Sequence, residues 1–290
     1  MNQIPLDVAQ LIAIAYAEDL GDRGDVTTAS VIDPNHESRA NLVVHEAGII
    51  AGLEIARACF SHIDPRIDML TIRNDGELVE AGTTVATVTG PTASILTAER
   101  VALNLVGHMS GIATATRAYV DAAAGTAASI SDTRKTTPGM RTIDKYAVVA
   151  GGGVNHRFGL YDAVLIKDNH IAAAGSIIEA VRRARASVGV DVIVEVEVDT
   201  IVQLSDVLAT DADRVLLDNM GIDQLVEAVA MVGGAMVTEA SGGIDLTTVR
   251  AVAETGVDII SVGWITHSAP ALDVALDIVP EPKVGSDQFE

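Results

Sequence analysis

The second half of the chain repeats one pattern, a short apolar run followed by a helical stretch, and this repetition restricts the possible folds more than any other feature. Six apolar runs follow Ala127, in the order AASISD, AVLIKD, VIVEVEV, RVLLDN, AMVTEAS and DIISVG. Most are separated by amphipathic stretches such as SIIEAVRRARASV and IDQLVEAVAMV. Strands that alternate with helices in this way form βα units around a parallel sheet. Because a complete βα barrel has eight strands, six runs predict an α/β fold with an incomplete, open barrel.

The first half lacks this repeat. Strand patterns such as SRANLVVHEAG and TTVATVT alternate with helical ones. Two consecutive helices are expected over roughly 94–106 and 110–124, with a break near Gly107. Such a mixture is typical of helices packed against an antiparallel sheet. We therefore predict two domains, 1–125 and 126–269, and place the active site in the second.

Charge and cysteine content exclude several functional classes. The chain has 19 Lys and Arg against 40 Asp and Glu, a net charge of −21, which argues against binding to nucleic acid or to an anionic membrane. Cys59 is the only cysteine, so no intrachain disulfide can form. The first residues lack a basic region, and no apolar run approaches the ~18 residues of a membrane span. A soluble, cytoplasmic protein is expected.

Positive charge is concentrated in one segment of this acidic chain. Between residues 134 and 167 only Asp144 and Asp162 oppose six cations. The six are Arg134, Lys135, Arg141, Lys145, Arg157 and Lys167. Arg and Lys are the usual partners of carboxylates and phosphates, and Gly139 and residues 151–153 would let backbone amides approach a ligand. The segment predicts a site for a small, highly anionic ligand; the alternative is a solvated basic loop.

Each predicted strand ends in a polar or glycine residue, and the carboxyl ends of barrel strands are where ligands bind. These residues are Asp132, Lys167, Asp168, Glu195, Glu197, Asp218, Glu239, Ser241, Ser261 and Gly263. Glu195 and Glu197 project from one face of a strand, so they need a cationic partner, for which Lys167 is expected. The glycine turn 241–243 suggests a phosphate site, and His156 and His267 are candidate site residues.

Several longer motifs then point to one family. DTRKTTPGMR, AGGGVNHRFGLYDAVLIKDNH, EVEVDT, LLDNM, SGGI and VGWITHS occur in this order, and together they resemble quinolinate phosphoribosyltransferase. The resemblance implies an N-terminal α/β sandwich, completed by a C-terminal helix over 270–290, joined to an open α/β barrel. It also implies transfer of phosphoribosyl from phosphoribosyl pyrophosphate to quinolinate, with Mg²⁺ and loss of CO₂, to give nicotinate mononucleotide for NAD synthesis. A homodimer, or a larger assembly of dimers, is expected.

The resemblance also assigns residues. Arg134, His156 and Arg157 would hold the quinolinate carboxylates, and Arg100 would reach the active site of the neighbouring subunit. The catalytic set would be Lys135, Lys167, Glu197 and Asp218, the last two contacting ribose or binding Mg²⁺ largely through the substrate. The remaining substrate-binding residues would be Thr133, Ser241, Gly242, Gly243, Val262, Gly263 and His267.

Two alternatives stay open. A relative with the same fold could act on another pyridine, although so many cations exceed the need of a mono-acid. The chain could also be a non-catalytic anion-binding protein on an enzyme-like scaffold. Glu197 and Asp218 count against that alternative, because an anion binder gains nothing from carboxylates at its site.

Overall fold

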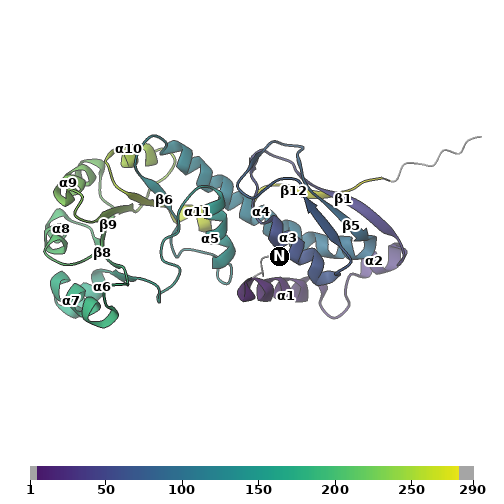
Figure 1. Ribbon diagram of the computed structural model, residues 1–290, viewed down its shortest axis with the longest axis horizontal. Helices are drawn as coiled ribbons and strands as arrows, with labels where there is room; N and C mark the ends of the chain where they lie inside the picture. Colours follow the sequence, from purple (N-terminus) through teal and green to yellow (C-terminus); the bar gives the residue numbers. More distant parts are fainter. Residues whose placement is uncertain (1–4, 281–290) are drawn as a thin grey trace, which may run out of the picture. The chain divides into compact units, whose positions relative to one another are not determined.

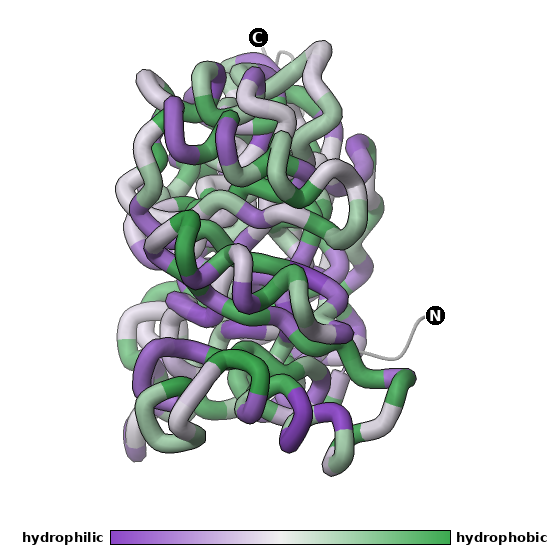
Figure 2. The backbone as a smooth tube through the Cα atoms, turned by 90° about the vertical axis from the view of Figure 1, so that its left-hand side faces the viewer, coloured by the Kyte–Doolittle hydropathy of each residue, from purple (hydrophilic) through white to green (hydrophobic). Residues whose placement is uncertain are grey.

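The computed structural model describes residues 5–280, which divide into two compact units, 5–111 with 271–280, and 112–270. Among the described residues no helix is both long and apolar enough to cross a membrane. Hydrophobic segments are repeatedly interrupted by hydrophilic ones along the backbone (Figure 2).

The first unit is an α/β sandwich built on a four-stranded antiparallel sheet in the order β12-β1-β5-β3 (Figure 1). Ala40, Leu42 and Val44 alternate along β1 and are fully buried, which gives the sheet one apolar face. Its elements are α1 (Leu6–Leu20), α2 (Val26–Val31), β1 (Glu37–Val44), β2 (Gly48–Ile49), α3 (Leu53–Ile63), β3 (Asp68–Thr71), β4 (Leu78–Val79), β5 (Thr84–Pro91) and β12 (Val274–Ile278).

The helix expected over 270–290 is wrong for the described part of that segment. Residues Val274–Ile278 form strand β12, which pairs antiparallel with β1, and residues 281–290 lie outside the described range. The run ALDVALDI has apolar residues at helical spacing. An available sheet edge outweighs that weak local preference.

A single helix, α4 (Thr92–Ala122), replaces the two helices expected on either side of Gly107. Gly107 does not break the helix but allows a close approach to it. A Cβ there would lie 2.9 Å from the Leu272 carbonyl oxygen, and the Leu272 N–H donates to the Gly107 carbonyl at 2.9 Å. The glycine therefore lets the 271–274 segment pack directly against the helix backbone.

The second unit is the predicted open barrel. Its parallel sheet has six strands in the order β6-β11-β10-β9-β8-β7, so within residues 5–280 no ladder joins β6 to β7. Helices α7 to α10 cover the outer face (Figure 1). The elements are β6 (Ser129–Ser131), α5 (Arg141–Ala150), β7 (Val164–Ile166), α6 (Asp168–Ala174), α7 (Ile177–Val188), β8 (Val194–Val198), α8 (Ile201–Leu208), β9 (Arg214–Asp218), α9 (Ile222–Val232), β10 (Val237–Ser241), α10 (Val249–Glu254), β11 (Ile259–Ser261) and α11 (Trp264–His267).

The segment between α5 and β7 extends the sheet beyond its free β6 edge. Val154 forms a parallel bridge with Ser131, its N–H donating to the Ile130 carbonyl at 2.8 Å. From there the chain runs through residues 155–163 to β7, the other free edge. Irregular backbone therefore occupies the place where a closed barrel would have further strands.

Candidate active site

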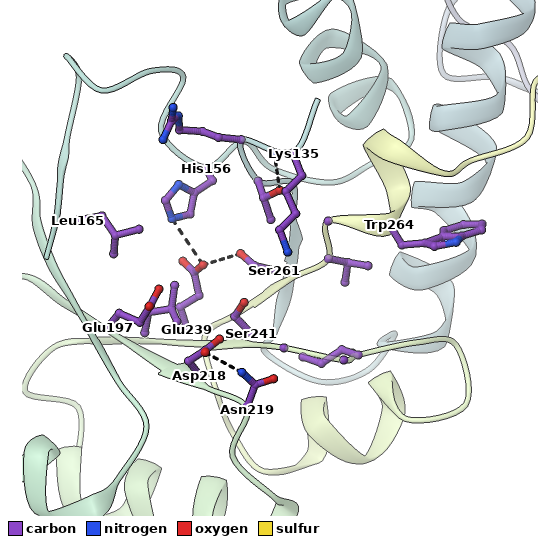
Figure 3. Close-up of a pocket in the computed structure, with 18 of the residues that line it drawn as sticks. Lys135, His156, Leu165, Glu197, Asp218, Asn219, Glu239, Ser241, Ser261 and Trp264 are labelled. Atoms are coloured by element: carbon purple, nitrogen blue, oxygen red, sulfur yellow. Dashed lines mark hydrogen bonds and ion pairs between the residues drawn. The ribbon is translucent and has the colours of Figure 1, made fainter. Parts of the chain in front are cut away.

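A cavity of about 840 Å³ opens where the parallel strands end, within the size range of small-molecule sites (Figure 3). It is lined by residues that lie in or directly after the carboxyl-terminal parts of all six strands of the sheet. The predicted site residues that line it are Thr133, Arg134, Lys135, His156, Arg157, Lys167, Glu197, Asp218, Ser241, Gly242, Gly243, Val262, Gly263 and His267. Because parallel strands present their carboxyl ends at one edge, residues far apart in sequence meet here.

One wall of the cavity carries two arginines whose side chains are only partly hydrogen-bonded within the described structure. Arg134 Nε and Arg157 Nε are buried without a hydrogen-bond partner in the described structure, and Arg157 Nη1 donates to the Ala163 carbonyl at 3.0 Å. Burial, and then the neighbouring charge of Arg134, lower the pKa of Arg157. A buried donor without an acceptor costs about 1–3 kcal/mol. Both guanidinium groups are therefore arranged for an anion that enters from outside.

The opposite wall carries carboxylates. Lys167 Nζ forms an ion pair with Glu197 Oε2. The sequence predicts Lys167 as the cationic partner of Glu195 and Glu197, and Glu197 is the one of the two that pairs with it. Asp218, at the end of β9, accepts a hydrogen bond from Asn219 Nδ2 at 2.7 Å (Figure 3). Opposite charges thus face one cavity, so a ligand with both anionic and electron-poor parts would fit it.

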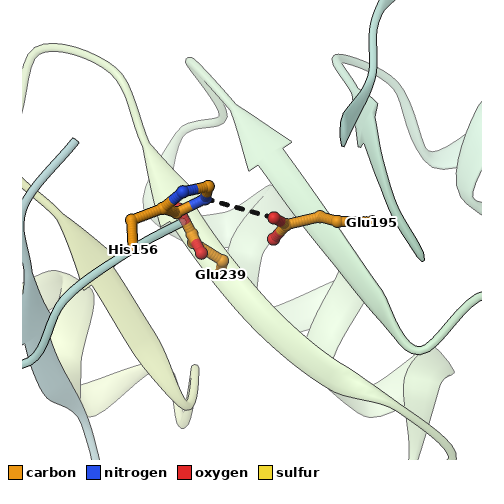
Figure 4. Close-up of side chains that lie close together, drawn as sticks. All are labelled: His156, Glu195 and Glu239. Atoms are coloured by element: carbon orange, nitrogen blue, oxygen red, sulfur yellow. Dashed lines mark hydrogen bonds and ion pairs between the residues drawn. The ribbon is translucent and has the colours of Figure 1, made fainter. Parts of the chain in front are cut away.

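Glu195 does not pair with Lys167 but lies beside His156 and Glu239 (Figure 4). His156 Nε2 is 3.1 Å from Glu195 Oε2 and 3.5 Å from Glu239 Oε1. The Arg157 N–H donates to His156 Nδ1 at 2.8 Å, so the neutral ring carries its proton on Nε2 and donates to Glu195. Ser261 Oγ donates to Glu239 at 2.5 Å. These three side chains are also the one group of the described residues whose potential metal-ligating atoms lie within 4.8 Å of one another.

Burial sets the protonation of this cluster. Desolvation, and then the charge of Glu195, raise the pKa of Glu239 to about 7. For His156, burial lowers the pKa, but the hydrogen bond to Glu195 and the charges of both glutamates raise it by more. The Arg157 N–H opposes protonation of the ring, since Nδ1 accepts a hydrogen bond only when it is unprotonated. Glu239 therefore keeps its proton up to near-neutral pH.

Comparison with known proteins decides the family. Residues 25–110 match the family model "Quinolinate phosphoribosyl transferase, N-terminal domain", and residues 112–277 match the C-terminal domain of the same family. The chain belongs to the quinolinate phosphoribosyltransferase family.

Relatives and solved structures agree with this membership. The chain is 43% identical over 273 residues to "Probable nicotinate-nucleotide pyrophosphorylase [carboxylating]" of Bacillus subtilis, covering 94% of each protein. It is 43% identical over 293 residues to "Quinolinate phosphoribosyltransferase [decarboxylating] 1b" of Nicotiana tabacum, covering 95% of this chain and 83% of that one. The nicotinate-nucleotide pyrophosphorylase structure from Francisella tularensis superimposes with a TM-score of 0.92 at 38% identity, over 96% and 98% of the two chains.

One residue assigned by resemblance to the quinolinate phosphoribosyltransferase family lies elsewhere. Arg100 is on α4 in the first unit, where its side chain is 64% exposed and lines a separate hollow with Asn104 and residues 271–274. Arg100 Nη2 forms an ion pair with Glu99 Oε1 at 3.9 Å. The described chain thus leaves the Arg100 guanidinium largely open to solvent.

Two cations of the basic segment do not line the cavity but hold its loops. Arg141 donates to Thr136 Oγ1 at 3.0 Å and to the Phe158 carbonyl at 3.1 Å. Lys145 is buried against Asp132. Because arginine and lysine also stabilise irregular backbone by donating to carbonyls, a charge count alone cannot separate these two from the cavity residues.

The glycines of the basic segment also differ from expectation, because they do not line the cavity. A Cβ on Gly151 would lie 2.5 Å from the Ala113 carbonyl oxygen, and one on Gly153 would lie 2.8 Å from Thr116 Cγ2. They serve close packing against α4 rather than ligand approach.

Sequence reasoning missed several cavity residues, namely Leu165, Leu216, Asn219 and Ile244, and gave no site role to Glu239 and Ser261. Asn219 had a usable signal, since it directly follows Asp218 at a strand end. It is the one non-glycine residue of the described chain with a positive φ, 54°. Trp264 lines the cavity too, and its ring packs beside Tyr119 at a centroid distance of 6.4 Å.

The contact between Asn219 and Gly242 gives a stability prediction. Gly242 has a φ of +102°, and a Cβ there would lie 2.2 Å from Asn219 Oδ1. Gly242→Ala should lower the free energy of unfolding by roughly 3 kcal/mol, because strain and overlap add. Gly234→Ala, with a φ of +81° and open space, should cost only about 1 kcal/mol. Equal losses in urea unfolding would contradict the close contact.

The raised pKa of Glu239 gives a second stability prediction. Its folded value, about 7, exceeds its ordinary value of 4.5, so its contribution to stability is complete below pH 4.5 and is lost as the pH rises through 7. Glu239→Gln keeps the shape of the protonated acid. The wild type should lose roughly 2–3 kcal/mol relative to this variant between pH 5 and 8, measured by denaturant unfolding. Parallel pH profiles would rule out the raised pKa of Glu239.

Proposed function

We propose that the protein transfers the phosphoribosyl group of phosphoribosyl pyrophosphate to the ring nitrogen of quinolinate. Loss of CO₂ then gives nicotinate mononucleotide, with pyrophosphate as the other product, in NAD biosynthesis. Membership of the family and the names of its relatives support this reaction. The carrying observation in the structure is the pair of buried arginines, Arg134 and Arg157, whose Nε atoms have no partner in the cavity wall.

Quinolinate supplies the hydrogen-bond acceptors that the Nε donors of Arg134 and Arg157 lack. It carries two adjacent carboxylates, and each can accept the planar donors of a guanidinium group. Arg134 and Arg157 repel each other in the absence of a ligand, so a dianion between them removes a cost as well as adding hydrogen bonds. His156 lines the same cavity and would add a third contact by turning its Nε2–H from Glu195 to the carboxylate, since both ring nitrogens have partners in the described structure.

The glycine turn at the end of β10 would take the 5-phosphate of the ribose. Gly242 and Gly243 both have positive φ, and such turns direct backbone N–H groups toward an anion. Lys135 lies beside the next turn, since a Cβ on Gly263 would be 3.0 Å from Lys135 Cδ. This lysine would reach the pyrophosphate side of the sugar.

Glycosyl transfer passes through a centre with oxocarbenium character at the anomeric carbon. Glu197 and Asp218 would stabilise that positive charge, while Lys167 and Lys135 neutralise the departing pyrophosphate. After transfer the ring nitrogen is quaternised, so its positive charge stabilises the electron pair left on the adjacent ring carbon when the carboxylate leaves as CO₂, and that carbon then takes up a proton from water. The substrate is thus its own electron sink.

Mg²⁺ fits the carboxylate wall better than the buried cluster. It prefers oxygen ligands, retains several waters and binds through one or two carboxylates together with substrate phosphates. Glu197 and Asp218 are half-buried and line the open cavity, which suits such a substrate-bridged ion. His156, Glu195 and Glu239 offer an imidazole and lie mostly out of reach of water. When bound, the metal would neutralise charge on the pyrophosphate.

We also propose a homodimer in which Arg100 completes the active site of the partner subunit, since its guanidinium is exposed and lines none of its own chain's main cavity. Arg100→Ala and Lys135→Ala should each be inactive as homodimers. After mixing and subunit exchange, activity should return to about a quarter of the wild-type value, because half the dimers carry one intact site. No recovery in mixtures that have demonstrably exchanged would reject a shared site.

The reaction is tested by supplying the protein with phosphoribosyl pyrophosphate, Mg²⁺ and either quinolinate or nicotinate. Nicotinate mononucleotide and CO₂ should form from quinolinate, and nicotinate should give no product. Product from nicotinate would indicate a relative with another ring specificity. Absence of product from both acids, in a folded protein that binds the sugar pyrophosphate, would reject the proposal.

A further inference from the structure

A buried ion pair lies behind the cavity wall and takes no part in lining it. Lys145 Nζ is 2.5 Å from Asp132 Oδ1, and the two residues are 1% and 0% exposed. Lys145 comes from α5, and Asp132 directly follows β6. Burying two charges costs about as much as their attraction returns, so such a pair is weak evidence for stability alone.

The pair holds both main-chain polar groups of one residue, His156. Asp132 Oδ1 accepts the His156 N–H at 2.8 Å, and Lys145 Nζ donates to the His156 carbonyl at 2.9 Å. With its amide in the orientation that satisfies its neighbours, Asn155 donates to Asp132 Oδ2 at 2.7 Å and to the Lys145 carbonyl at 3.0 Å. Asp132 and Lys145, which we call the clamp, therefore hold the main chain of His156 and the side chain of Asn155.

The backbone that the clamp holds belongs to no helix or strand, so hydrogen bonds of regular secondary structure do not fix it. After the bridge at Val154 the chain leaves the sheet and does not enter another strand until β7 begins at Val164. His156 and Arg157 extend from this stretch to the cavity. A shift of the backbone at His156 would move both side chains together, and displacements near 1 Å at a binding group can cost about 10²-fold in rate.

We propose that Asp132 and Lys145 are positioning residues, which fix the backbone at His156 so that His156 and Arg157 meet the carboxylates of the pyridine substrate. This inference rests on the function proposed above. It separates Lys145, which acts through the main chain at His156, from the cations of the basic segment that line the cavity.

The test removes both charges together, since loss of only one would leave the other buried and unpaired. Asp132→Asn/Lys145→Met keeps an oxygen acceptor for the His156 N–H and the apolar stem of the lysine, but loses the bond to the carbonyl. The KM for quinolinate should rise at least about tenfold, with the KM for phosphoribosyl pyrophosphate within about twofold of wild type. A purely structural role would move neither KM. If the double variant does not fold, Lys145→Arg carries the test, because it keeps the buried charge pair while displacing the donor to the His156 carbonyl, with a smaller rise expected.

Two further variants interpret the outcome. Ile143→Ala destabilises the same helix from a buried apolar position and should leave both KM values unchanged. Arg157→Met reports on the site itself: if it leaves the quinolinate KM unchanged, the proposed binding role fails and the positioning role with it. If Arg157→Met raises the KM for quinolinate while the folded Asp132→Asn/Lys145→Met variant does not, the positioning role of Asp132 and Lys145 is rejected and the binding role of Arg157 stands.

Discussion

Replacing Arg134 or Arg157 by methionine should lower kcat/KM for quinolinate by about 10³-fold, while leaving the protein at least as stable as the wild type. Each guanidinium supplies charge-assisted hydrogen bonds to a buried carboxylate, and truncating one partner of such a pair costs about 2–5 kcal/mol. In the absence of ligand the two groups gain little from the protein, since each has a buried Nε without a partner and Arg134 depresses the pKa of Arg157. Methionine keeps most of the apolar stem, so packing survives.

Steady-state kinetics and thermal unfolding together check this prediction. Arg183→Met is the matched control, because Arg183 is an exposed arginine of the same unit that pairs with Glu179. That variant should keep both activity and stability. A large fall in melting temperature for Arg134→Met or Arg157→Met, with unchanged kcat/KM for the remaining folded protein, would make these arginines structural.

Asp218→Asn should lower kcat by roughly 10²-fold or more with little change in stability. The substitution removes one negative charge near the anomeric carbon and keeps the size of the side chain. Asn219, which donates to Asp218 Oδ2, can donate to the new amide oxygen as well. The Mg²⁺ concentration for half-maximal activity should also rise, because one carboxylate of the proposed metal site is lost.

Rates measured over a Mg²⁺ titration test this prediction. Asp223→Asn serves as the control, since Asp223 is an exposed carboxylate in the first turn of α9, directly after the same strand. An Asp218→Asn enzyme with normal kcat and an unchanged Mg²⁺ requirement would remove Asp218 from the catalytic set.

The barrel could be predicted because each of its strands is a short apolar run with a polar end, and parallel strands gather those ends at one edge. That rule alone brings Lys167, Glu197 and Asp218 together. It could not show that Glu195 turns to His156 rather than to Lys167, because this depends on where an irregular segment passes. Nor could it show that Lys145 faces inward, since a lysine in a basic segment usually faces a ligand or water.

The errors in the first unit have a different origin. The resemblance predicts a C-terminal helix and local preference predicts a helix break at Gly107, whereas the conformations of Val274–Ile278 and Gly107 depend on each other's surroundings. Strand β12 forms because the edge of β1 is available to pair with it. Gly107 is required because the chain that leads to β12 packs directly against it. Contacts between residues more than 160 positions apart are invisible to a window of a dozen residues.

The gap between β6 and β7 has a consequence for redesign. In a closed barrel the residues that contact the ring acid would belong to strands, where a one-residue insertion reverses the direction of every following side chain. Here the 155–163 segment crosses the gap outside any ladder. Loops of altered length could therefore be exchanged between these two free edges while the six strands keep their register. Ring specificity is thus open to laboratory evolution in one short stretch, separately from the sugar-phosphate end of the cavity.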